Sequence, residues 1–156
     1  MYYNIYCDGA ATMKKINDEY VRCAGGYGVV IYDSDNIILN QLSGAAAQTT
    51  NNEQELTAIY EALKWLRECG NTAAATIYSD SAYCINIFTQ WADGWAARGW
   101  TRKGNKPIEN CELIKSIYFL LKEMPQVKFE KVKGHNKCIG NILADELAVK
   151  AKQSIS

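Results

Sequence analysis

Short apolar runs separated by polar turns begin the chain and predict three strands. Residues 2–8 are rich in aromatic and β-branched side chains, and residues 26–32 and 37–39 enclose the turn-forming residues 33–36. Residues 10–22, between the first two runs, are mostly polar, which predicts a loop. The first part of the chain is therefore expected to form three antiparallel strands joined as a meander.

The apolar positions then take up the period of a helix. Residues 52–69 carry one apolar stripe and end before Gly70. A strand over residues 75–80 and a helical segment over residues 81–90 follow, and the Trp- and Gly-rich segment after them is expected to be irregular. The remaining expected elements are a helix from Pro107 to about Glu123, a strand over 127–132, a loop over 134–140 and a helix over 141–152.

This order of elements predicts an α/β fold built on a mixed five-stranded sheet flanked by helices. Numbered along the chain, the strands are expected in the order 3-2-1-4-5, with right-handed crossovers and with strands one and four as parallel neighbours. Beside strand one the direction of winding reverses. An open α/β sheet leaves a crevice there, at the carboxyl ends of its strands, and ligands bind in it.

Composition indicates one globular domain over residues 1–156. With 48% hydrophobic and 22% charged residues, the chain can bury a core of ordinary size. It has no N-terminal basic-then-apolar segment, and no apolar run reaches the roughly 18 residues that span a bilayer. Six cysteines are present without a Cys-x-x-Cys pair. We expect a soluble, cytoplasmic protein with reduced thiols, without a zinc site or a disulfide framework.

Cations gather locally although the net charge is zero. Residues 94–108 contain four cations and no acid, interleaved with Trp95 and Trp100, and residues 128–137 contain four lysines around Glu130. Basic clusters with aromatic side chains suit a phosphate backbone. Four charges at a turn are also typical of a solvated loop, so this pattern alone does not decide between the two.

One glutamate lies on the apolar stripe of the first expected helix. Glu55 shares the stripe with Ile59 and Leu63, whereas Glu61 and Lys64 fall on the opposite face. Burying an unpaired carboxylate costs on the order of several kcal/mol. Glu55 therefore needs a cation, a hydrogen-bond network, or a first-turn position that water reaches and that suits the helix dipole.

Three more acids are expected near Glu55. Asp8 ends strand one and Asp80 ends strand four, and Asp145 lies on the flank of the apolar stripe of the last helix. Each acid alone is typical of a cap or a strand end, but four acids that converge by topology indicate a site. Carboxylates repel one another unless a hard cation lies between them, and Mg²⁺ or Mn²⁺ suits such ligands. Two such ions about 4 Å apart can activate water and stabilise phosphoryl transfer.

The only histidine, His135, lies in the sequence Lys133-Gly134-His135-Asn136, ten residues before Asp145. A lone histidine is commonly a satisfied polar residue. On a glycine-flanked loop beside a metal cluster, however, an imidazole can carry protons or help the product to leave.

These motifs together resemble type I ribonuclease H, an endonuclease that hydrolyses the RNA strand of RNA–DNA hybrids. The matching pieces are Asp8-Gly9-Ala10, Thr50-Asn51-Asn52-x-x-Glu55-Leu56, Ser79-Asp80-Ser81, residues 91–107, Lys133-Gly134-His135 and Asp145-Glu146-Leu147-Ala148. The resemblance implies a ribonuclease H-like fold with no separate hybrid-binding domain, and a monomer with no obligate protein partner. It also implies that Asp8, Glu55, Asp80 and Asp145 hold two Mg²⁺ ions, replaceable by Mn²⁺, that His135 assists, and that cleavage leaves 5′-phosphate and 3′-hydroxyl ends.

The resemblance also implies where the hybrid binds. Asn51, Asn52 and Ser81 match minor-groove contacts, where 2′-hydroxyls distinguish RNA from DNA. Residues 91–106 match a basic protrusion that grips the DNA strand, with Trp95 as a stacking surface. The implied substrate-binding residues, including a DNA phosphate pocket at Thr50 and Asn110, are Thr50, Asn51, Asn52, Ser81, Trp91, Trp95, Arg102, Lys106, Asn110 and Asn141.

Some positions depart from the family pattern. Residues 10–22 are longer than the short turn common in bacterial members, which leaves only Asn17 as a candidate for a 2′-hydroxyl contact there. Ala82 stands where many members have a base-contacting glutamine, and Gln48 stands where a phosphate-binding arginine is common. The protrusion also has fewer cations than in strongly basic members. These departures predict weaker or more salt-sensitive hybrid binding with the chemistry intact.

Two other functions fit part of the pattern. Another nuclease or strand-transfer enzyme on the same fold uses the same acids and metals, and a silent nucleic-acid-binding module can retain them without turnover. The Asn51-Asn52 pair and the Trp-rich protrusion favour the hybrid nuclease.

Overall fold

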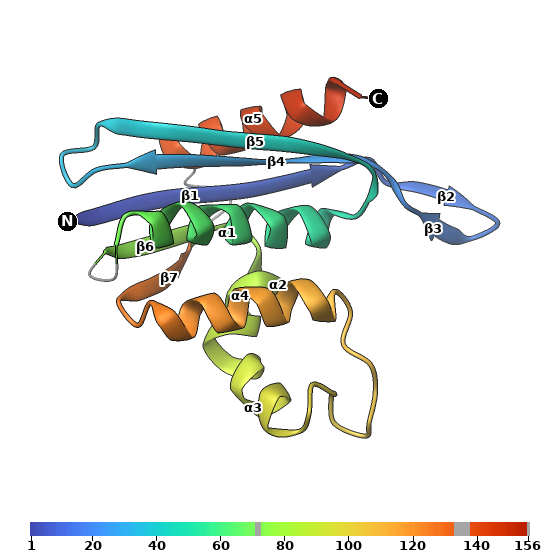
Figure 1. The fold of residues 1–156 in the computed structure, drawn as a ribbon. Coiled ribbons are helices and arrows are strands. Elements are labelled where there is room, and N and C mark those ends of the chain that lie inside the picture. The colour runs from blue at the N-terminus through green and yellow to red at the C-terminus, as the bar shows by residue number, and fades with distance from the viewer. Residues whose placement is uncertain (71–72, 133–137, 156) are drawn as a thin grey trace.

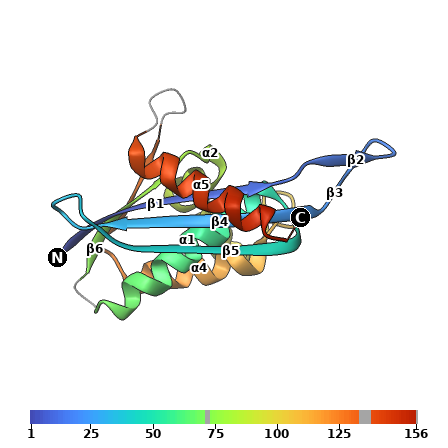
Figure 2. The same cartoon turned by 90° about the horizontal axis from the view of Figure 1, so that it is seen from above.

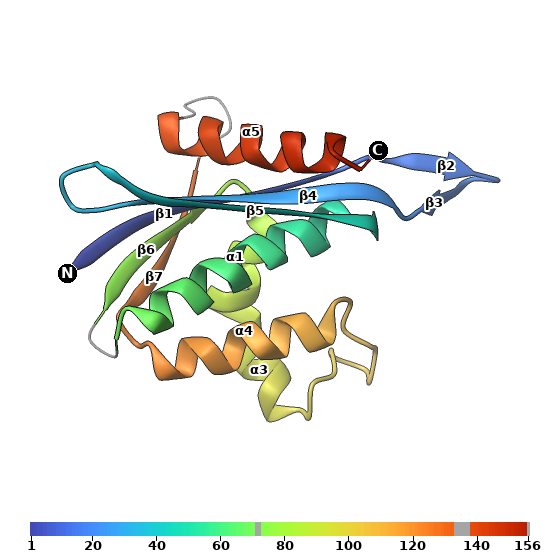
Figure 3. The same cartoon turned by 45° about the horizontal axis from the view of Figure 1, so that its top comes forward.

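The sheet lies between helices on both of its faces. A computed structural model describes residues 1–70, 73–132 and 138–155. Helices α1 and α4 cover one face of the sheet and α5 covers the other (Figures 1 and 3). The two termini lie toward opposite ends of the long strands (Figure 1).

Five strands form the main sheet in the order β5-β4-β1-β6-β7. Strand β1 pairs antiparallel with β4 and parallel with β6, and β6 pairs parallel with β7. The predicted order 3-2-1-4-5 is therefore confirmed, because the two additional short strands form a separate hairpin. The strands are β1 (Tyr2–Ala11), β2 (Lys14–Ile16), β3 (Glu19–Val21), β4 (Cys23–Tyr32), β5 (Ile38–Thr49), β6 (Ala74–Ser79) and β7 (Val127–Lys131).

Helix α1 packs its apolar stripe on the sheet. Thr50 caps it, because the Thr50 side chain accepts a hydrogen bond from the Glu53 amide at 3.1 Å. Ile59 and Leu63 of α1 are fully buried, as are Ile5 and Ile77 of the sheet. The helices are α1 (Asn51–Glu68), α2 (Ala82–Asn86), the π-helical turn η1 (Ile87–Trp91), α3 (Ala92–Ala97), α4 (Cys111–Glu123) and α5 (Ile139–Gln153). Among the helices in the described part of the chain, none has both the length and the apolar character to cross a membrane.

Three segments differ from the sequence-based expectation. Strand β5 continues to Thr49, far beyond residue 39, because its small residues pair with β4 along the whole edge. Ala92–Ala97 is helical, although its Trp and Gly content indicated an irregular segment. Helix α4 begins at Cys111 and not at Pro107, since Asn110 immediately before it has a left-handed backbone with φ of 59°.

The expected loop over residues 10–22 contains the β2–β3 hairpin. The central residues of its turn, Asn17 and Asp18, have φ angles of 53° and 65°. Positive φ at both central residues defines the tight hairpin turn that matches strand twist, and Asn and Asp adopt it readily. The hairpin continues beyond the end of the main sheet, past the start of α1 (Figures 1 and 2).

Candidate metal-binding and nucleic-acid site

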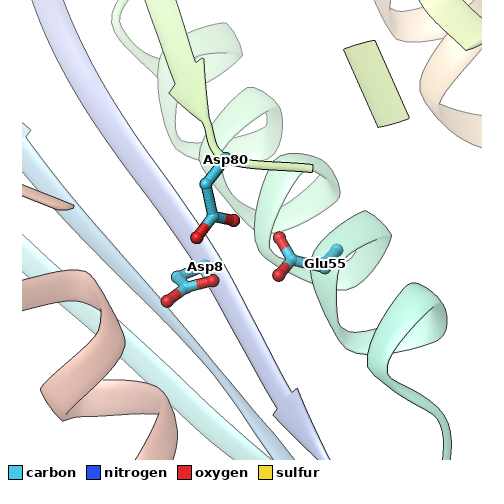
Figure 4. A group of neighbouring side chains, drawn as sticks. All are labelled: Asp8, Glu55 and Asp80. Atoms are coloured by element: carbon cyan, nitrogen blue, oxygen red, sulfur yellow. The ribbon is translucent and has the colours of Figure 1, made fainter. Parts of the chain in front are cut away.

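Three of the four predicted acids meet at one place. Asp8 lies within β1 and not at its end as predicted, because pairing with β4 extends β1 to Ala11. Asp80 follows β6, and Glu55 projects from α1 toward both aspartates (Figure 4). Each of the three offers a carboxylate oxygen within 4.8 Å of the others. The meeting point is the carboxyl end of two parallel neighbouring strands, where the winding of the sheet reverses.

A glycine allows α1 to approach β1 at this point. A Cβ atom on Gly9 would collide with the backbone nitrogen of Glu55 and with the backbone of Gln54. Gly9 directly follows Asp8, so the contact fixes Glu55 beside the aspartate through the backbone of both elements. In the pair Asp8-Gly9, Asp8 therefore supplies a carboxylate to the cluster and Gly9 allows the close packing of α1 on β1.

Asp145 comes close to the cluster from the opposite face of the sheet. Gly28 is the partner of Asp8 in the β1–β4 ladder, and a Cβ atom there would collide with the Ala144 carbonyl of α5. The next residue of α5 is Asp145, whose charge contributes to raising the pKa of Asp8. Asp145 thus lies beside Asp8, although it is outside the group of three within 4.8 Å.

Two acids of the cluster are buried, and a hydrogen bond of 2.9 Å from the Gly9 amide to Asp8 Oδ1 compensates only part of that burial. Asp8 is 3% exposed and Glu55 is 8% exposed. The pKa of Asp8 is raised to about 7, mainly by burial; a hydrogen bond with Glu55 lowers it, and the charges of Asp80 and Asp145 raise it. Burial also raises the pKa of Glu55 well above its usual range, and the charge of Asp8 adds to this effect.

The donor set fits a divalent cation. None of the ion pairs within residues 1–70, 73–132 and 138–155 involves Asp8, Glu55 or Asp80. One carboxylate oxygen of Glu55, Oε2, is buried and lacks a hydrogen-bond partner among the same residues. Hard carboxylate oxygens that converge and lack a cation are the ligands that Mg²⁺ and Mn²⁺ prefer.

Three further residues predicted near the cluster have different outcomes. His135 lies outside the described residues, so its placement stays a prediction. Asn141, in the first turn of α5, is 1% exposed, and its Nδ2 atom has no hydrogen-bond partner among the described residues. Ser81 caps α2 by accepting a hydrogen bond from the Cys84 amide at 3.2 Å, and it directly follows Asp80.

The start of α1 forms an exposed polar surface beside the cluster. Thr50, Asn51 and Asn52 line a pocket of about 370 Å³ together with residues that flank the β2–β3 hairpin. The Asn51 side-chain oxygen accepts a hydrogen bond from the Ala11 amide at 2.6 Å, so Asn51 also ties α1 to the end of β1.

The Trp-rich segment forms a second pocket. Trp91, Trp95 and Arg102 line a cavity of about 390 Å³. The two tryptophan rings lie 5.9 Å apart, and the Arg102 Nε atom donates a hydrogen bond to the Pro107 carbonyl at 3.0 Å. Lys106 pairs with Arg102 through the backbone and is exposed. The structure therefore brings these four predicted substrate-binding residues together in one segment.

Thr50 and Asn110 do not line the same pocket. Asn110 lines a cavity of about 650 Å³ with Glu53 and Gln54, whereas Thr50 lines the pocket beside the hairpin. The Nδ2 atom of Asn110 is buried and has no hydrogen-bond partner among the described residues. Their joint role in binding one phosphate stays a prediction.

Sequence reasoning missed residues of the hairpin. Met13 and Tyr20 line the pocket at the start of α1, and Arg22 forms an ion pair with Glu53 at 2.6 Å. The signal that could have found them is the Asn17-Asp18 pair, which favours a two-residue hairpin turn.

The ribonuclease H family model matches residues 1–153. The ribonuclease H of Chlorobium limicola is 39% identical over 149 residues, covering 94% of this chain and 92% of that protein. The ribonuclease H of Thermosynechococcus vestitus is 37% identical over 144 residues, covering 92% and 84%.

Solved structures agree with these relatives. LC9-RNase H1, described as a type 1 RNase H with the type 2 active-site motif, is 26% identical with a TM-score of 0.83, covering 99% of this chain and 74% of that one. The PFV RNase H domain is 25% identical with a TM-score of 0.81, covering 99% and 96%. The strand order, the acid cluster and these matches place the chain in the ribonuclease H family.

Proposed function

We propose that the chain hydrolyses the RNA strand of RNA–DNA hybrids with the help of divalent cations held by Asp8, Glu55, Asp80 and Asp145. The observation that carries the proposal is the cluster of three carboxylates within 4.8 Å, two of them buried, which forms no ion pair with a cation of the described residues. A fold that keeps such a cluster bears a cost in stability, and a cation-dependent activity accounts for it.

Two Mg²⁺ ions, replaceable by Mn²⁺, are the proposed cofactors. When bound, they supply an activated water and neutralise charge on the attacking and leaving oxygens. The residues of the chain hold and orient them: Asp8 from β1, Asp80 from just after β6, Glu55 from α1 and Asp145 from α5. Because the pKa of Asp8 is raised to about 7 and that of Glu55 is also raised, cation binding displaces protons from the cluster.

The proposed products are a 5′-phosphate and a 3′-hydroxyl. His135 is proposed to shuttle protons or to assist release of the product, a role that rests on the sequence resemblance alone. Asn141, whose buried Nδ2 atom lacks a partner among the described residues, is proposed to donate a hydrogen bond in the catalytic region.

The proposed substrate surface consists of two regions, the start of α1 and the Trp pocket. Asn51 and Asn52 at the start of α1, with Ser81, are proposed to contact the minor groove and its 2′-hydroxyls. The pocket of Trp91, Trp95 and Arg102, with Lys106, is proposed to hold the DNA strand by stacking and by phosphate contacts. The relatives named ribonuclease H support this substrate class. We propose that the chain acts as a monomer.

The test is a cleavage assay with labelled RNA–DNA hybrid, duplex RNA and duplex DNA in Mg²⁺, Mn²⁺ or EDTA. The expected result is cleavage of the RNA strand of the hybrid alone, with 5′-phosphate ends, and none in EDTA. Cleavage of duplex DNA would favour another nuclease on this fold, and cleavage in EDTA would exclude the role of the acid cluster.

A further inference from the structure

The β2–β3 hairpin presents two different faces to its surroundings. Lys15 pairs with Tyr20 across the two strands, and the Lys15 ammonium lies 5.0 Å from the centre of the Tyr20 ring. Lys14 pairs with Val21, and Ile16 pairs with Glu19. Because side chains alternate along a strand, the first pair lies on one face and the other two pairs on the opposite face.

The face that carries Lys15 and Tyr20 is the one on the side of α1. Arg22, two residues after Tyr20, shares its face, and the Arg22 side chain forms an ion pair with Glu53 of α1 at 2.6 Å. Met13, Tyr20 and Val21, at the base of the hairpin, line the same pocket as Asn51 at the start of α1, so the Arg22–Glu53 ion pair is the contact that identifies the face. This face of the hairpin, which we call the α1-side face, consists of Met13, Lys15, Tyr20 and Arg22.

The α1-side face has large exposed side chains and no acid of its own, and Lys15 is the cation it offers to a phosphate, because Arg22 is paired with Glu53. Tyr20 is 66% exposed and Met13 is 64% exposed. Of the two acids of the hairpin, Glu19 lies on the opposite face and Asp18 lies at the turn. A basic surface with an exposed aromatic ring suits a sugar-phosphate backbone, because the ring packs on the sugar or base and the ammonium contacts phosphate.

The hairpin also lies in line with the acid cluster. Strand β1 continues past Asp8 to Ala11. A hydrogen bond of 3.0 Å from the Thr12 amide to the Ala24 carbonyl then extends the pairing with β4 toward the hairpin. Lys15 is seven residues after Asp8. At about 3.3 Å per extended residue, Lys15 lies up to roughly 23 Å from Asp8, which is about seven phosphates of one strand along the helix axis.

We infer that the α1-side face of the β2–β3 hairpin binds the backbone of the hybrid beyond the Asn51-Asn52 surface, with Lys15 on a phosphate and Tyr20 packed on an adjacent sugar or base. This inference rests on the proposed hybrid substrate. It gives the segment over residues 10–22 a role in affinity that is independent of base sequence, because phosphate and stacking contacts carry no base readout. It also supplies a cation contact in a protein whose net charge is zero.

The two lysines of β2 provide a matched test. Lys15→Ala and Lys14→Ala remove the same charge from neighbouring exposed positions, but only Lys15 lies on the α1-side face. Binding of a fluorescent RNA–DNA hybrid is measured in EDTA over a range of salt concentrations, so that the readout needs no turnover. The melting temperature of each variant is measured to show that the fold is kept.

The expected result differs between the two lysines. Lys15→Ala raises the Kd about three- to tenfold at low salt and lowers the slope of log K against log salt by about 1, whereas Lys14→Ala changes the Kd less than about twofold. Tyr20→Ala weakens binding to a similar degree without changing the salt slope, and Tyr20→Phe binds like the parent.

Failure of this inference and failure of the proposed function are distinguishable. Equal Kd values and salt slopes for Lys14→Ala and Lys15→Ala would overturn the inference, and so would a parent protein that does not bind the hybrid. A parent that binds the hybrid with the expected difference between the lysines, but does not cleave it in Mg²⁺ or Mn²⁺, would support the hairpin contact and overturn the proposed catalytic function.

Discussion

The acid cluster and the hairpin lie near the same end of the sheet but are built in opposite ways. Asp8, Glu55 and Asp80 come from β1, α1 and the residue after β6, which are core elements. They converge where α1 packs closely on Gly9 of β1, so the backbone there has little room to move. Lys15 and Tyr20 lie on a two-stranded extension that is exposed on both faces. Burial of the acid cluster lowers the stability of the fold. The hairpin adds no buried charge to the core, and its inferred role is in affinity for the hybrid alone.

The largest effect is expected at the residue that joins the helix to the cluster. Glu55→Gln should reduce hybrid cleavage by at least about 100-fold, because it removes a ligand charge and leaves a poorer cation site. The same change should stabilise the metal-free protein by on the order of 1 kcal/mol, since it relieves repulsion with Asp8. Cleavage rates and urea unfolding in EDTA measure the two effects.

Glu68→Gln is the control for this change. Glu68 ends the same helix and is exposed, so its replacement should leave both cleavage and stability near the parental values. A Glu55→Gln protein that cuts hybrid at the parental rate would exclude Glu55 from the site.

A pH dependence of stability is the second expected effect, and it follows from Asp8. The folded-state pKa of about 7 exceeds the unfolded value of about 3.9, so the folded protein holds more protons between these values. The free energy of unfolding in EDTA should therefore fall as the pH rises between these two pKa values. The decrease should be a few kcal/mol at most, which is the size that this pKa shift implies. The raised pKa of Glu55 acts in the same direction.

Unfolding free energies at pH 5 and pH 8 in EDTA measure this dependence. Asp8→Asn should flatten it, and Mg²⁺ should restore stability to the parent at pH 8, where the carboxylates are free to bind it. If the unfolding free energy changes equally with pH in the parent and in Asp8→Asn, Asp8 does not titrate between pH 5 and pH 8.

The exposed Trp pocket should give a smaller effect than the cluster. Trp95→Ala should weaken hybrid binding about tenfold, because an aromatic platform contributes roughly 1–3 kcal/mol per stacked base, with little change in the cleavage rate at saturating substrate. Because Trp95 is partly buried against the core, the melting temperature of Trp95→Ala is measured as well, and Trp95→Phe, which keeps an aromatic ring, is the control. A loss in cleavage rate without a change in Kd would contradict a binding role.

The same contrast explains what the sequence could predict. Glu55 was accessible to sequence reasoning because a charged residue on an apolar stripe is an inconsistency that demands a partner. Asp8 and Asp80 followed from the sheet order, since parallel neighbours end at one edge. The hairpin was not accessible, because its strands have three residues each and both faces are exposed, so no core-facing alternation marks them.

Other details depended on tertiary contacts. The extension of β5 to Thr49 is set by pairing with β4, and its run of Ser, Gly and Ala carries little strand preference of its own. The start of α4 at Cys111 depends on the left-handed backbone of Asn110. The sequence-based prediction began the helix at Pro107, because proline is common at the first position of a helix.

The smallest effect is expected at Gln48, on β5 next to the start of α1. Gln48 is exposed, and its carbonyl accepts a weak hydrogen bond of 3.4 Å from Arg22, so a longer cation fits there without disturbing the core. Gln48→Arg should tighten hybrid binding about two- to threefold at low salt and increase the salt slope by about 1, because it adds one phosphate contact. Gln126→Arg, exposed at the amino end of β7, adds the same charge far from the proposed surface and should not tighten binding. Equal affinities of the two variants would mean that net charge alone acts on the hybrid, and that the end of β5 does not face it.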